Sequence, residues 1–75
     1  MTTTNSARKL YQGVTTAIAE EIAAGRYLPG QKLPSERELT ETYNVSRATI
    51  REAMIALAIR GLVEARHNAG VFVAA

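Results

Sequence analysis

Apolar residues recur at every fourth position over the first third of the chain, which is the spacing of one face of a helix. The positions are Leu10, Val14, Ile18 and Ile22, with Ala17 beside them. We expect this helix to begin at about residue 7 and to end near Gly25, which can adopt the left-handed conformation that closes a helix. Residues 1–6 are mostly polar and uncharged, and we expect a disordered tail there.

A turn and a second helix are expected in the middle of the chain. Pro29-Gly30 suits a type II turn, in which glycine takes the position of positive φ. Residues 31–33 then precede a proline, which favours an extended backbone. Ser35, followed three residues later by Glu38, fits a capping box at the start of a short helix.

A turn and a third helix follow at once. Asn44 can take the left-handed conformation that ends one helix, and Ser46 can cap the next. We expect the third helix to run from about Arg47 to Arg60 and to end at Gly61. Its apolar stripe packs inward and consists of Ile50, Ala53, Met54 and Leu57.

Two short runs at the end of the chain alternate like strands. Residues 62–66 and 71–73 flank a turn over residues 67–70 that contains a glycine, which predicts a hairpin. The expected fold is mainly α with a small β-wing: a winged helix-turn-helix of three helices plus a short β-hairpin, with residues 7–75 as one domain.

Charge is unevenly distributed along the 75 residues, whose formal net charge is +2. Five of the seven acidic residues precede Asn44, whereas four arginines follow it against two glutamates. The basic excess therefore lies in the half that holds the third helix. Such an excess in one part of the chain favours nucleic-acid binding.

The residue inventory removes most other chemistries. The chain has no cysteine, no aspartate and a single histidine, which excludes disulfides and thiolate metal sites and most acid–base dyads, triads and metal clusters. We therefore expect that the protein is not an enzyme and that it binds neither a metal nor a cofactor. No apolar run is long enough to span a membrane, and the first residues do not resemble a signal peptide. We expect a cytoplasmic protein without membrane contact.

Two arginines near the start of the third helix are the strongest candidates for function. Arg47 and Arg51 lie four residues apart, on the same side of that helix. Arginine can fork onto O6 and N7 of guanine in the major groove, and Thr49 offers a hydroxyl for phosphate or base. The alternative is a solvated helix face with two ordinary arginines.

Further candidates lie on the second helix and in the wing. Arg37 is placed to contact a phosphate, although it could simply pair with Glu41 one turn later. Arg66, His67 and Asn68 form a hairpin tip that could enter the minor groove; the alternative is a plain connecting turn.

Ile55 and Ile59 lie four residues apart and point away from the buried stripe. They are expected to be exposed, either as scattered apolar residues or as a contact surface for a second subunit or another domain. A winged-helix module for protein–protein contact is accordingly the alternative function, and this pair is the only feature that favours it. A small enzyme is the second alternative, and the residue inventory argues against it.

The chain resembles the N-terminal domain of GntR-family bacterial transcription regulators over roughly residues 10–73. The matching segments are Pro29–Leu39 (PGQKLPSEREL), Val45–Ala53 (VSRATIREA), Gly61–Val63 (GLV) and Gly70–Val73 (GVFV). Arg-Glu-Ala at 51–53 is most similar to the FadR subfamily. Tyr11-Gln12, Ile55 and Ile59 are similar to the uronate-responsive repressors of that subfamily.

The resemblance implies a metabolite-responsive regulator, expected to be a repressor, that binds a palindromic operator in double-stranded DNA as a homodimer. It also implies a C-terminal effector-binding domain for a small molecule, which this chain lacks. By the family pattern, Arg47 and Arg51 read guanines and Arg37 contacts the backbone or a nearby base. Ser46 and Thr49 contact phosphate, and His67 enters the minor groove.

Two departures from the family pattern lie near these residues. Asn68 stands where the family often has glycine, although asparagine tolerates left-handed conformations better than most residues. Ala48 and Ala69 stand where polar or basic residues are common, which suggests a wing that holds DNA less tightly.

Overall fold

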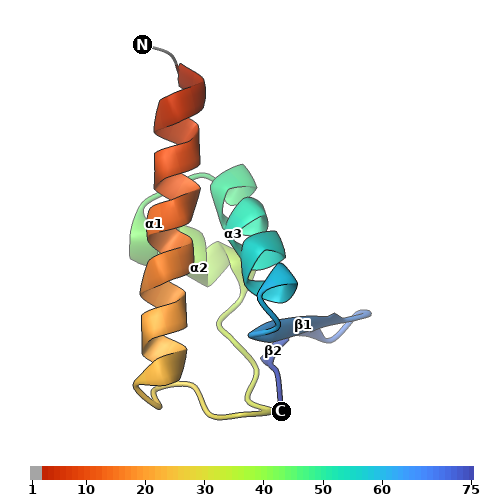
Figure 1. The fold of residues 1–75 in the computed structure, drawn as a ribbon. Coiled ribbons are helices and arrows are strands. Elements are labelled where there is room, and N and C mark those ends of the chain that lie inside the picture. The colour runs from red at the N-terminus through yellow and green to blue at the C-terminus, as the bar shows by residue number, and fades with distance from the viewer. Residues whose placement is uncertain (1–2) are drawn as a thin grey trace.

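The computed structural model describes the backbone of residues 3–75 and the side chains of residues 9–75. The described residues form three helices followed by a hairpin, and Figure 1 shows this hairpin projecting to one side. In chain order the elements are α1 (Thr3–Ala23), α2 (Glu36–Tyr43), α3 (Arg47–Ile59), β1 (Val63–Arg66) and β2 (Gly70–Val73). The predicted fold, three helices plus a short β-hairpin, is confirmed for these residues.

Helix α1 begins earlier than its apolar stripe suggested. Residues 3–6 are helical, so the prediction of a disordered tail is wrong for them; residues 1 and 2 lie outside the described residues. Once a helix has nucleated, each added residue gains a hydrogen bond at little further cost. No glycine or proline stands among residues 3–12 to stop it.

The core lies where α1 crosses α3, with the wing closing one end. Val14 and Ile18 of α1 are buried against the inward stripe of α3, and the stripe itself is as predicted. Leu10 belongs to the same stripe of α1 but is 51% exposed, because the first turns of α1 rise beyond the other helices (Figure 1). The buried apolar side chains are Val14, Ile18, Leu33, Leu39, Ile50, Ala53, Leu57, Val63 and Val73.

The segment before α2 adds a third extended piece beside the hairpin. Gly30 has φ of +84°, and Gln31 donates its backbone N–H to the carbonyl of Leu28 at 2.9 Å, which confirms the type II turn. Leu33 donates to the carbonyl of Val71 at 2.8 Å, and residue 32 bridges residue 72 antiparallel. The wing is thereby attached to the start of α2.

None of the helices described between residues 3 and 75 has the length and apolar character needed to cross a membrane.

Candidate nucleic-acid interface

The turn between α2 and α3 sets the direction of the third helix. Asn44 adopts φ of 55° and ψ of 50°, the left-handed conformation that the sequence predicted. Ser46 caps α3: its Oγ accepts the backbone N–H of Thr49 at 3.1 Å. Ile50, fully buried, fixes the inner side of the first turns. Because the inner side is packed, the residues on the opposite side of these turns face solvent.

The start of α2 is fixed by the predicted capping box. Ser35 Oγ accepts the backbone N–H of Glu38 at 3.1 Å, and the Glu38 carboxylate accepts the backbone N–H of Ser35 at 2.8 Å. Hydrogen bonds from the backbone and side chain of Ser35 lower the pKa of Glu38 below its ordinary value of 4.5. The first turn of α2 is therefore rigidly defined relative to the chain before it.

Glu36, in that first turn, contacts both arginines of α3. Arg51 donates a hydrogen bond from Nε to Oε2 of Glu36 at 2.9 Å. Arg47 forms an ion pair in which its Nε lies 3.0 Å from Oε1 of the same carboxylate. Each arginine side chain is 63% exposed and that of Glu36 is 34% exposed. One carboxylate thus holds two guanidinium groups side by side at the surface.

Arg37 lies apart from this cluster. Its Nε is 3.8 Å from Oε2 of Glu41, the intrahelical pair that the sequence offered as an alternative. Both side chains are highly exposed, and such pairs contribute little to stability. The pair therefore leaves the guanidinium of Arg37 accessible to a phosphate group.

Ser46 and Thr49 have hydroxyls that are already engaged with each other. Ser46 Oγ and Thr49 Oγ1 are 3.0 Å apart. A hydroxyl carries one donor and two acceptor sites. One of the two hydroxyls can therefore still donate to a phosphate oxygen while their mutual contact is kept.

The wing carries the remaining predicted residues. Asn68 has φ of 60°, which confirms that asparagine takes the left-handed position in the turn. Cζ of Arg66 lies 4.2 Å from the centre of the Phe72 ring, and its Nη2 is 3.5 Å from Oε2 of Glu64. Arg66 is therefore held against the hairpin, whereas His67 is exposed at the tip.

Lys32 supplies a further cation at the wing. Its Cε and Nζ lie only 2.7 and 3.5 Å from the point where a Cβ at Gly70 would stand. The aliphatic stem of the lysine therefore passes over the first residue of β2, next to the hairpin turn, at a position that only a glycine leaves open.

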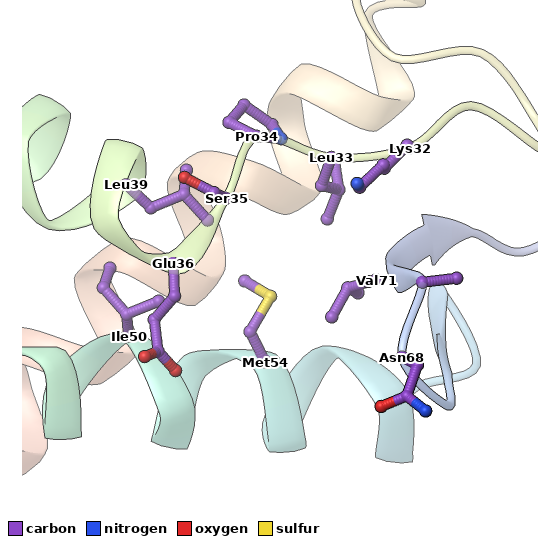
Figure 2. A pocket seen from close by; sticks show the side chains of 12 residues that line it. Lys32, Leu33, Pro34, Ser35, Glu36, Leu39, Ile50, Met54, Asn68 and Val71 are labelled. Carbon is purple, nitrogen blue, oxygen red and sulfur yellow. The ribbon is translucent and has the colours of Figure 1, made fainter.

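Glu36, which contacts the two arginines, and Asn68 of the wing both line one groove (Figure 2). Leu39, Ile50 and Met54 are among the apolar residues that line it; Glu36 stands at one end and Asn68 at the other. The structure thus brings Arg47 and Arg51 together and keeps Arg37 and the wing separate from them.

The contacts of two residues on this surface did not follow from the sequence. Glu36 lies fifteen positions before Arg51, and Lys32 lies far from Gly70 along the chain. No local signal indicated which residues these side chains contact.

Ile55 and Ile59 are exposed, as predicted, at 54% and 81%. Ile55 also borders a small apolar hollow between α3 and the wing, together with Met54 and Ala58. At successive i+4 positions, the pair continues the stripe of Arg47 and Arg51 into the second half of α3.

Comparison with known proteins gives a consistent result. The family model described as bacterial regulatory proteins, gntR family, matches residues 10–73. The chain is 45% identical over 73 residues to the Uxu operon transcriptional regulator of Escherichia coli, covering 97% of this chain and 28% of that protein. It is 42% identical over 64 residues to the probable fructoselysine utilization operon transcriptional repressor of Escherichia coli, covering 85% of this chain and 26% of that protein.

A solved structure shares the fold. The crystal structure of the AraR DNA-binding domain in complex with operator ORX1 superposes with a TM-score of 0.84 at 42% identity, over 87% of this chain and 78% of that one. The curated relatives are much longer than this chain, which spans little more than a quarter of their length. Because the family match covers most of the chain and agrees with the fold, the chain belongs to the GntR family of bacterial regulatory proteins.

Proposed function

We propose that this chain is the sequence-specific DNA-binding domain of a transcription regulator, with α3 in the major groove and the wing in the minor groove. The observation that carries the proposal is the pair of arginines, Arg47 and Arg51, held together on the exposed side of the first turns of α3. A helix that is packed on one side and presents forked donors on the other is suited to reading guanine. The operator-bound AraR domain of the same fold supports this assignment.

The other residues divide between anchoring and the minor groove. Arg37, Ser46 and Thr49 would bind phosphate, since they lie at the N-terminal ends of α2 and α3, where backbone N–H groups also favour anions. Arg66, His67 and Asn68 would enter the minor groove, which a hairpin tip reads by its width and A·T content.

The whole regulator would act in the cytoplasm as a homodimer on a palindromic operator and would respond to a small effector bound by a further domain. Repression is the proposed mode, supported by the name of one relative as an operon repressor. Assignment to the FadR subfamily stays a prediction.

The test is selection of bound sequences from a random DNA pool by the dimeric full-length protein. We expect a palindrome with guanine in each half-site. Arg47→Ala or Arg51→Ala should each reduce affinity for the selected site by ~1–3 kcal/mol and relax base preference. Arg60→Ala removes an equal charge from the far end of α3 and serves as the matched control.

DNA affinity measured as a function of salt concentration tests whether Arg37 anchors the phosphate backbone. Arg37→Ala should weaken selected and random DNA alike and reduce the salt slope by about 1. A protein that enriches no sequence and shows no salt-dependent binding to DNA would contradict the proposal. That result would favour protein–protein contact through the exposed Ile55 and Ile59.

A further inference from the structure

The carboxylate that joins the two arginines has no part in the function proposed above. Glu36 is acidic, yet it lies in the middle of a surface proposed to meet a polyanion. A carboxylate close to phosphates opposes binding by Coulomb repulsion. Its presence there requires a reason other than affinity for DNA.

The arginine atoms that Glu36 contacts suggest such a reason. Among residues 9–75, its contacts with both arginines run through Nε, at 3.0 Å for Arg47 and 2.9 Å for Arg51. This leaves the two terminal Nη nitrogens of each guanidinium at the outer end of the side chain. Those nitrogens are the pair that can donate together to O6 and N7 of one guanine. Contact with Glu36 is therefore compatible with reading a base.

The carboxylate is itself well positioned. It extends from the first turn of α2 toward α3 (Figure 2), and that turn is fixed by the capping box of Ser35 and Glu38. An unheld arginine has many rotamers, and immobilising such a side chain opposes binding through lost conformational entropy. Two arginines that are already oriented in the free protein avoid most of that loss.

We propose that Glu36 is a specificity-determining positioning residue: it orients Arg47 and Arg51 for base readout and repels DNA where no guanine meets them. On a matching site the oriented arginines bind and offset the repulsion. On other sequences the repulsion stays uncompensated, so discrimination between sites increases. This inference rests on the proposed role of the two arginines.

Two substitutions of Glu36 separate the effect of its side-chain length from the effect of its charge. Glu36→Gln removes the charge, whereas Glu36→Asp keeps the charge and shortens the side chain by one methylene, so that it cannot hold both arginines. Glu41→Gln is the matched control, because Glu41 is on the same helix and pairs only with Arg37 among residues 9–75. Each variant is compared with wild type in the full-length protein, on a duplex selected by wild type and on a random duplex.

We expect Glu36→Gln to reduce the ratio of selected to random affinity about tenfold, as loss of part of two bidentate contacts implies. Glu36→Asp should reduce the ratio by a similar factor without raising random affinity. Glu41→Gln should change both affinities alike and leave the ratio within about twofold. Circular dichroism and thermal unfolding show whether each variant is folded.

Other outcomes would overturn the inference. If Glu36→Gln strengthens binding to both duplexes and leaves the ratio unchanged, Glu36 only competes with DNA for the arginines. If Glu36→Asp behaves as wild type, charge alone acts and positioning is wrong. If wild type itself enriches no sequence, the proposed function fails first, and that failure is seen before any variant is made.

Discussion

Replacing Gly70 by alanine tests how the wing is attached to the rest of the domain. Gly70 has φ of +117°, outside the range that residues with a Cβ adopt readily. A side chain forced into such a region costs on the order of 1–3 kcal/mol. The new Cβ would also stand 2.7 Å from Cε of Lys32. Two causes of destabilisation therefore act at one position, and their sizes can be compared.

The strained φ angle should contribute more to the destabilisation than the clash with Lys32. The clashing atom is near the end of a flexible and exposed side chain, which can move aside by turning a χ angle about 30° off its rotamer at a cost of about 0.5–1.5 kcal/mol. The φ angle, in contrast, is held by the backbone bonds of the hairpin and the adjoining segment. We expect Gly70→Ala to destabilise the fold by about 2 kcal/mol, which lowers the melting temperature by roughly 8–16 °C in a domain of this size.

Urea or thermal unfolding of four variants checks this. Gly13→Ala is the matched control: Gly13 lies inside α1 with nothing within 4 Å of its added Cβ, so it should stabilise by ~0.5–1 kcal/mol. The same change from glycine to alanine should thus lower the free energy of unfolding at Gly70 and raise it at Gly13. The Lys32→Ala variant and the double variant complete a cycle. If removing Lys32 recovers most of the loss at Gly70, the clash dominates and the reasoning from φ is refuted.

Two further predictions concern the caps. Ser46→Ala should destabilise the domain by ~1 kcal/mol, because the backbone N–H of Thr49 loses its acceptor; Ser46→Asn, which can still cap, should lose much less, and equal losses in urea unfolding would contradict the capping role. The lowered pKa of Glu38 makes its stabilising contribution complete above about pH 4.5 and lost as the pH falls through the lower folded value. Glu38→Gln should therefore flatten the decline of stability below pH 4.5, and an unchanged pH profile would exclude Glu38 as its source.

Elements bounded by local signals could be predicted from the sequence. Ser35, Asn44, Ser46 and Gly61 each act within three or four residues, through a cap or a left-handed φ, so their effect can be read without knowing the fold. The inward stripe of α3 followed from helical spacing for the same reason. Helices α2 and α3 accordingly begin directly after their predicted caps, and α3 ends at Ile59, one residue before the predicted end.

Features that depend on distant contacts could not be predicted. The link from Glu36 to Arg51 spans fifteen positions and depends on the angle between α2 and α3. The contact of Lys32 with Gly70 depends on how the extended segment meets the wing. The early start of α1 had a different cause: residues 3–6 are helical without an apolar stripe, because an existing helix extends easily into polar sequence.

The first turn of α2 combines two separate tasks in adjacent residues. Glu38 points back to the cap at Ser35, whereas Glu36 points across to the arginines of α3. Side chains two positions apart on a helix face different directions, so neither glutamate can replace the other. They share no hydrogen-bond partner among residues 9–75, although they stand in the same helical turn, so a double-mutant cycle is needed to separate their effects. The double variant of Glu36→Gln and Glu38→Gln should accordingly show the lost discrimination of the first and the flattened pH profile of the second. A strong interaction between them would mean that the cap itself transmits orientation to Arg47 and Arg51.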